Sequence, residues 1–115
     1  AQHLTKNFNN RFGLTFPTCQ PMIAEDLSCR IKSLRDPTKK MSKSDPDPKS
    51  YINLLDKPDE IRVKIKKSVT DCISAVAFEP DERPGVANLI MLHSMTTGKS
   101  PGEICDENKH LDTGK

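Results

Sequence analysis

The chain has 115 residues, which is the size of one small domain. Hydrophobic residues make up only 34% of it, and with no Trp, one Tyr and four Phe it can build only a thin core of its own. Its 18 basic residues nearly balance 16 acidic ones, so the net charge of +2 does not by itself indicate a nucleic-acid-binding protein. No apolar run approaches the roughly 20 residues that cross a bilayer, so we expect a soluble protein without membrane contact.

The four cysteines, Cys19, Cys29, Cys72 and Cys105, are widely spaced and form no C-x-x-C pair. Zinc sites usually need such paired ligands, so we predict no metal site in this chain. Nothing in the sequence indicates the extracellular setting of a disulfide framework, and we expect mostly buried free thiols in a reducing compartment. His93 lies inside an apolar run, which predicts a hydrogen-bonded core residue.

The chain begins with a predicted amphipathic helix. Leu4, Phe8 and Phe12 recur every four residues, so they share one helix face, and Gly13 is a natural C-terminal stop. Residues 14–28 then contain two prolines and mixed polar residues, which indicates a connection with one short helical turn near residues 22–26.

Residues 29–34 are predicted to form a short strand, because Cys29 and Ile31 alternate with Arg30 and Lys32. Ligands of open α/β sheets bind beyond the carboxyl ends of strands. The segment that follows this strand is therefore where a binding site is expected.

That segment holds two lysines, Lys40 and Lys43, in the string Lys-Met-Ser-Lys-Ser. Asp-Pro pairs lie on both sides of the string and favour turns over helix, and we call residues 36–49 the lysine loop. A lysine ammonium is a compact charge on a flexible stem, so two of them suit the oxygens of a polyphosphate. We expect a mobile basic loop that can close over a nucleotide triphosphate. The alternative is a pair of solvated surface lysines.

Residues 51–55 could be a short extended segment, after which a helix is predicted with Asp56 as its N-cap. Ile61, Ile65 and Val69 would form the apolar face of this helix. Its basic residues crowd toward the C-terminal end, where they complement the helix dipole, and stability alone explains them. Such a helix could also lie beside an RNA backbone.

Residues 79–85 are a polar break with two prolines, and they predict a boundary between units at residues 1–80 and 81–115. Beyond the break, a buried apolar helix is expected over residues 86–95, with Gly98 as its end.

Ser100 and Glu103 form a capping box around Pro101. This pattern predicts a short last helix that runs to about Asn108.

The string Lys40-Met41-Ser42-Lys43-Ser44 resembles the KMSKS signature of class I aminoacyl-tRNA synthetases, and the Asp-Pro that follows is similar to the tryptophanyl rather than the tyrosyl enzymes. Further resemblance runs through residues 2–4, 11–12, 30–34, 67–71 and 83–90. It implies an α/β, mostly helical fold: the C-terminal part of a Rossmann-type catalytic domain over residues 1–80, then the beginning of a helical tRNA-binding domain over residues 81–115.

The resemblance implies an enzyme that activates tryptophan with ATP and Mg²⁺ to tryptophanyl-adenylate and transfers it to tRNA(Trp), as a homodimer in its full-length form. Lys40 and Lys43 would be catalytic and hold the β- and γ-phosphates. The residues that would bind ATP are Ile31, Lys40, Met41, Ser42, Lys43 and Ser44. Ile31 is explained equally well as a plain core residue of a strand.

The family's histidine-containing first signature and its tryptophan pocket do not occur in these residues, and both ends look cut from something longer. We therefore expect half of an active site, inactive when alone. The sequence of residues 31–36 resembles animal mitochondrial members of the family more closely than many bacterial ones. This favours the mitochondrial matrix as the location of the protein, with the bacterial cytoplasm as the alternative. Another class I synthetase, such as a tyrosyl enzyme, and a non-catalytic RNA-binding module are the other interpretations that stay open.

Overall fold

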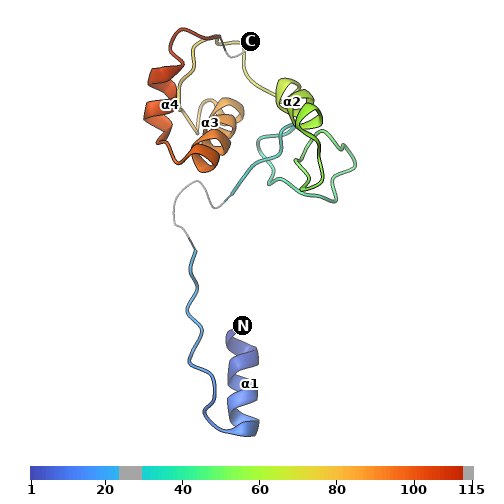
Figure 1. Cartoon of the computed structure of the whole chain (residues 1–115), viewed down its shortest axis with the longest axis vertical. Coiled ribbons are helices and arrows are strands. Elements are labelled where there is room, and N and C mark those ends of the chain that lie inside the picture. Colours follow the sequence, from blue (N-terminus) through green and yellow to red (C-terminus); the bar gives the residue numbers. More distant parts are fainter. Residues whose placement is uncertain (24–29, 113–115) are drawn as a thin grey trace.

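The computed structural model describes residues 1–23 and 30–112. Four α-helices lie in this part of the chain: α1 (Gln2–Phe12), α2 (Pro58–Lys66), α3 (Pro84–Thr97) and α4 (Pro101–Glu107). The molecule is elongated, with extents of 61 × 31 × 25 Å. Figure 1 shows α1 well apart from the other three helices. None of the described helices is long and apolar enough to cross a membrane.

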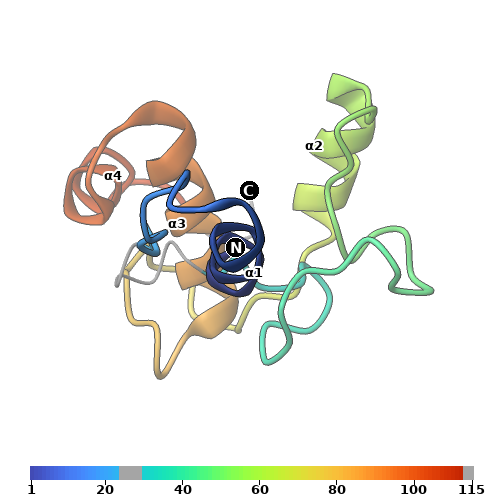
Figure 2. The same cartoon turned by 90° about the horizontal axis from the view of Figure 1, so that it is seen from below.

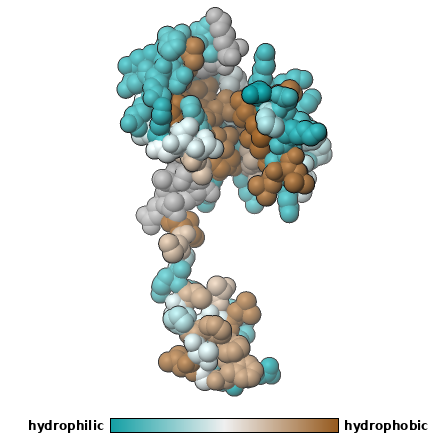
Figure 3. All heavy atoms as spheres, in the orientation of Figure 1, coloured by the Kyte–Doolittle hydropathy of each residue, from teal (hydrophilic) through white to brown (hydrophobic). Residues whose placement is uncertain are grey.

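Helix α1 confirms the first predicted helix, and it ends at Gly13, whose φ of 84° suits glycine. The chain then turns back along the helix, where Asn9 Oδ1 accepts the N–H of Phe16 at 3.0 Å. The ring of Phe8 packs against Phe12 and Phe16, with centroids 4.7 and 4.9 Å apart. These rings stay exposed, and Figure 3 shows the apolar colouring over this part of the molecule. The helix face is therefore as predicted, but nothing in the described residues covers it.

The strand predicted for residues 29–34 is wrong over the part that the structure describes. Lys32 forms a single antiparallel bridge with Lys40, and the neighbouring residues belong to no strand. The chain turns at residues 37–38 and again at residues 43–44, so only a few residues can run alongside. Ladder pairing needs a longer parallel or antiparallel partner. Cys29, like most of the turn predicted near residues 22–26, lies outside the described residues.

Helix α2 begins at Pro58 with Lys57 as its N-cap, so the predicted N-cap, Asp56, is wrong by one position. The Asp56 carboxylate instead accepts the N–H of Asn53 at 2.8 Å and a hydrogen bond from Lys64. These bonds close a turn at residues 54–55, which replaces the extended segment expected there. An aspartate that closes such a turn is satisfied by the residues before it rather than by the helix after it.

The apolar face predicted for α2 is only partly correct. Ile61 and Ile65 are half-buried, but the helix ends at Lys66, so Val69 lies beyond it. Val69 is exposed at its side chain, while its N–H donates to the carbonyl oxygen of Leu34 at 2.7 Å. The segment after α2 therefore packs through its backbone.

Helices α3 and α4 carry the apolar core of the described residues. Val86, Ile90 and Ile104 are buried together, and Figures 1 and 2 both show the two helices side by side. Gly98 ends α3 in the left-handed conformation with φ of 74°, as predicted. Ser100 Oγ accepts the N–H of Glu103, which confirms the capping box of α4.

Two predictions about single side chains are wrong. His93 is exposed, although it lines an open pocket together with Val86, Ile90 and Ile104 of the apolar cluster. Cys72 is also exposed, and Cys19 and Cys105 are only half-buried. These three thiols are free, as expected, but the small core leaves them without full cover.

Candidate functional site

The lysine loop departs from a base held by two backbone hydrogen bonds. The N–H of Met41 donates to the Ile31 carbonyl oxygen at 2.9 Å, and the N–H of Ser33 donates to the Lys39 carbonyl oxygen at 2.9 Å. Together these bonds make the bridge between Lys32 and Lys40. They fix the positions at which the chain leaves and rejoins this base.

Asp36 organises the first turn of the loop. Its carboxylate accepts hydrogen bonds from the Thr38 hydroxyl at 2.5 Å and the Thr38 N–H at 3.1 Å, and Lys39 Nζ lies 2.9 Å away. The Thr38 hydroxyl, followed by Lys39, lowers the pKa of Asp36 to about 2. The hydrogen bond to Asp36 raises the pKa of Lys39. Lys39 is thus a lysine whose charge is already matched within the loop.

Lys40 and Lys43 differ from Lys39. Both are exposed, and within residues 1–23 and 30–112 neither ammonium group has an ion-pair or hydrogen-bond partner. The hydroxyls of Ser42 and Ser44 lie beside them and bond to each other at 2.9 Å. The loop therefore presents two cations and two hydroxyls to solvent within five residues.

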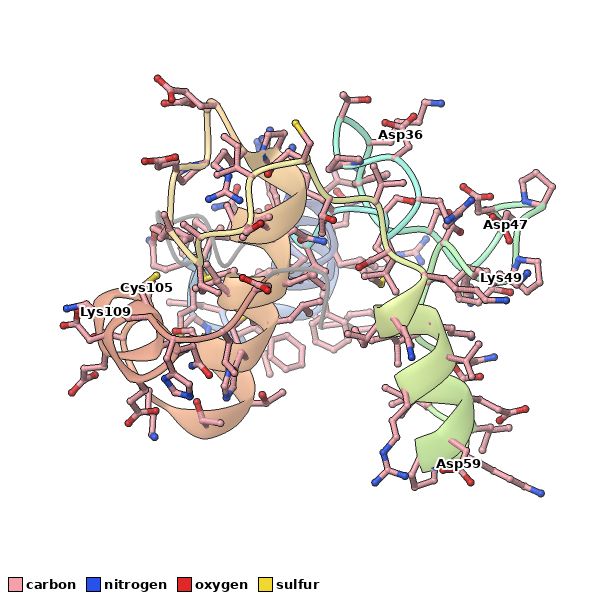
Figure 4. The ribbon with its side chains drawn as sticks, turned by 90° about the horizontal axis from the view of Figure 1, so that it is seen from above. Asp36, Asp47, Lys49, Asp59, Cys105 and Lys109 are labelled. Atoms are coloured by element: carbon pink, nitrogen blue, oxygen red, sulfur yellow. The ribbon has the colours of Figure 1, made fainter. Side chains whose placement is uncertain are left out.

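The far end of the loop is tied back to the base. Asp45 Oδ1 accepts the N–H of Asp47 at 2.9 Å, and the Asp47 carboxylate lies 3.4 Å from Arg35. The N–H of Leu34 then donates to the Ser50 carbonyl oxygen at 2.9 Å. In Figure 4, Asp36 and Asp47 lie on the loop, far from Cys105 of α4 and from Lys109. Both ends of the loop are thus anchored, while the side chains of Lys40 and Lys43 are not.

The basic residues of α2 are partly occupied by acidic neighbours. Lys64 bonds to Asp56 and lies 5.2 Å from the centroid of the Tyr51 ring, and Arg62 pairs with Asp59 at 2.8 Å. A helix with some of its cations already paired is a weaker candidate for an RNA backbone than a fully unpaired basic face.

The structure brings most of the predicted site residues together. Ile31 and Met41 are joined by a backbone bond, Lys40 belongs to the bridge, and Ser42 and Ser44 follow directly. Lys43 lies between the two serines. No group of three metal-ligating side chains lies among the residues that the structure describes.

Comparison with known proteins shows to which family the chain belongs. A sequence model described as "tRNA synthetases class I (W and Y)" matches residues 1–112. The chain belongs to this family.

Relatives in the family are similar over most of the chain. A tryptophan–tRNA ligase of Caldanaerobacter subterraneus is 46% identical over 109 residues, covering 95% of this chain and 33% of the relative. One from Bacillus anthracis is 45% identical over 104 residues, covering 90% of this chain and 31% of the relative. The chain thus spans about a third of the length of these relatives.

A solved structure agrees with the family assignment. The tryptophanyl-tRNA synthetase of Mycoplasma pneumoniae superposes with a TM-score of 0.63 at 26% identity, over 93% of this chain and 32% of that one. The fold of this chain is therefore that of a portion of a class I synthetase. The expected boundary at residues 80 and 81 stays a prediction, although hydrogen bonds such as that between Arg83 and Asp71 cross it.

Sequence reasoning assigned no role to two residues that shape this site, Asn88 and Arg83. Both are buried polar residues at the start of an otherwise apolar helix. A lone polar residue in such a helix must find partners when buried. A polar residue in an apolar helix was therefore the available sequence signal, but it does not identify the residues that Asn88 and Arg83 bind.

Proposed function

We propose that the lysine loop is the phosphate-binding part of an ATP site, in a full-length protein that attaches tryptophan to tRNA(Trp). The observation that carries this proposal is the contrast among three neighbouring lysines. Lys39 is matched by Asp36, whereas Lys40 and Lys43 extend from an anchored base without an acidic partner among the described residues. Membership of the synthetase family supports the same assignment.

In the proposed reaction, the tryptophan carboxylate attacks the α-phosphorus of ATP, and pyrophosphate leaves. Negative charge builds up on the leaving oxygens, and Lys40 and Lys43 stabilise it by electrostatics because their charges are not neutralised beforehand. A ribose hydroxyl of the tRNA then attacks the adenylate carbonyl and releases AMP.

The other residues of the loop have supporting roles in the proposal. Ser42 and Ser44 offer hydroxyls to phosphate oxygens or to each other. Met41 and the backbone of Ile31, which are joined by a hydrogen bond, line the adenine side. We propose Mg²⁺ only as the ion that accompanies the ATP phosphates, and we assign it no side chain of this chain.

Further parts of the proposal concern the full-length protein. We propose a Rossmann-type catalytic domain that is completed by residues outside this chain, and a homodimeric assembly. The mitochondrial matrix is the proposed location, and fluorescence microscopy of the tagged full-length protein tests it. The 115-residue chain alone should not activate tryptophan, since the groups that orient the attacking carboxylate are expected elsewhere.

The proposal is tested with Lys43→Ala in the full-length protein. Tryptophan-dependent exchange of labelled pyrophosphate into ATP should slow by about 10²-fold or more, while the KM for tryptophan stays nearly constant. Lys39→Ala is the matched control, because it removes a neighbouring lysine whose ammonium is already paired. Parent-like exchange in the Lys43 variant, or equal losses in both variants, would refute the proposal. Exchange that depends on tyrosine instead would reassign the amino acid.

A further inference from the structure

Asn88 binds the backbone of a residue that is distant in the sequence. Its Oδ1 accepts the N–H of Lys32 at 2.8 Å, and its Nδ2 donates to the carbonyl oxygen of Lys32 at 3.0 Å. Only one orientation of the amide satisfies both bonds. The side chain is well enclosed, with Asn88 7% exposed.

The position of Lys32 explains why this contact matters. Along an antiparallel pair, successive residues direct their backbone groups to alternate sides. Ile31 and Ser33 direct theirs to the returning chain of the lysine loop. Lys32 therefore directs its own N–H and carbonyl group to the opposite side, where Asn88 supplies the two bonds that a third strand would make.

The helix that carries Asn88 is itself fixed at its start. The Arg83 guanidinium, 3% exposed, binds the Asp71 carboxylate through two bonds of 2.7 and 2.8 Å, and it also donates to the carbonyl oxygens of Ala75 and Ile73. This contact lowers the pKa of Asp71. A bidentate pair with additional backbone bonds has a well-defined geometry.

A second contact lies one residue into α3. A Cβ added at Gly85 would lie 2.3 Å from the Val69 carbonyl oxygen, so the two backbones already touch. Val69 in turn bonds to Leu34, beside the base of the lysine loop. Asn88 thus docks the start of α3 directly onto the base from which the loop extends, and Gly85 does so through Val69. Arg83 fixes the start of the same helix to residues 71–75.

We propose that Asn88 is a positioning residue for the lysine loop, and that it sets where Lys40 and Lys43 begin by holding the backbone of Lys32. This inference rests on the proposed function of the loop. Asn88 touches no substrate in this scheme. It acts through the bridge between Lys32 and Lys40.

Three variants of the full-length protein test the inference. Asn88→Ala removes both bonds to Lys32. Asn88→Asp keeps the size of the side chain and the acceptor for the Lys32 N–H, but at neutral pH it replaces the donor to the Lys32 carbonyl by an oxygen. Ile90→Val, in the same helix and buried in the apolar core, is the matched control because it loosens packing without touching Lys32.

Two readouts are needed. In Asn88→Ala and Asn88→Asp, amide hydrogen exchange in residues 30–42 should speed up about tenfold or more, because the base opens locally. The kcat/KM for ATP in pyrophosphate exchange should fall about tenfold, with the KM for tryptophan unchanged. Ile90→Val should leave both readouts within about twofold.

The outcomes separate this inference from the proposed function. Equal hydrogen exchange of residues 30–42 in the Asn88 and Ile90 variants, or a parent-like Asn88→Asp protein, would overturn the positioning role. If Asn88→Ala opens the base while kcat/KM for ATP stays at the parent value, the positioning role in the reaction is overturned as well. Failure of the proposed function is seen independently, as parent-like pyrophosphate exchange in Lys43→Ala.

Discussion

The lysine loop and the α3–α4 pair are ordered by different forces. The loop is held by short-range bonds from aspartate and serine side chains to nearby backbone groups, such as those of Asp36 and Asp47. The helix pair is held by Val86, Ile90 and Ile104, which are buried in one cluster. Polar bonds at the surface compete with water and open at low cost, whereas apolar burial does not. A segment that must move and a helix that must hold it therefore use different chemistry.

The largest effect is expected from the apolar side of this comparison. Ile90→Ala in the full-length protein should lower the free energy of unfolding of the unit that contains α3 by about 2–5 kcal/mol, since it leaves a cavity in the cluster. The midpoint of urea unfolding, followed by fluorescence and circular dichroism, measures it. Asp36→Ala, a variant of a half-buried loop residue outside the apolar cluster, is the control and should shift the midpoint much less. Similar shifts in both variants would show that the loop is not the weaker region.

Gly85→Ala should cost about 1–3 kcal/mol, because the new methyl group meets the Val69 backbone rather than a side chain that can move aside. Gly102→Ala in α4 is the control, since nothing lies within 4 Å of its added Cβ. In a helix this second change should stabilise by up to about 1 kcal/mol. Thermal unfolding of the two variants should therefore move in opposite directions, and a shared direction would contradict the docking of α3 on Val69.

Hydrogen exchange sharpens the comparison in the native state. Amides of residues 38–48 should exchange at least about tenfold faster than those of α3, and they should slow when ATP is added to the full-length protein. An ATP-dependent slowing that also occurs in the Lys40→Ala, Lys43→Ala double variant would argue against these lysines as the phosphate contacts.

The smallest effect concerns the first turn of the loop. Because the pKa of Asp36 is lowered from 3.8 to about 2, its contribution to the turn is present above pH 3.8 and is lost as the pH falls through about 2. NMR titration of the carboxyl carbon should show Thr38→Val raising this pKa more than Lys39→Ala does, since the Thr38 hydroxyl is the larger cause. The reverse order would mean that charge, not the hydroxyl bond, organises the turn.

How much could be predicted from the sequence depends on how local the signal is. Gly98 and the Ser100 capping box decide the ends of α3 and α4 within a few residues, so these elements were predicted correctly. Asp56 was misassigned because a turn and an N-cap compete for the same side chain. The strand was misjudged because pairing depends on a partner segment that residues 29–34 do not specify.

The residues of the candidate site also differ in how local their sequence signal is. Lys40 and Lys43 could be proposed as site residues from a short string with flanking turns, since such a loop carries its own sequence signal. Asn88 could not, because its partner lies 56 residues away and no periodicity links them. Contacts of that range are fixed by packing, and only the folded arrangement of α3 reveals them.

The amide of Asn88 also has a protective consequence. A short extended segment with an unpaired N–H and carbonyl group is an open β-edge, on which a strand from another molecule can assemble. Lys32 would be such an edge if α3 were removed or displaced. Asn88 pairs with the N–H and the carbonyl group of Lys32 through its side chain. A side chain offers no further backbone groups, so no additional strand can pair beyond it. The same two hydrogen bonds therefore leave no unpaired backbone group at Lys32 on which such a strand could start.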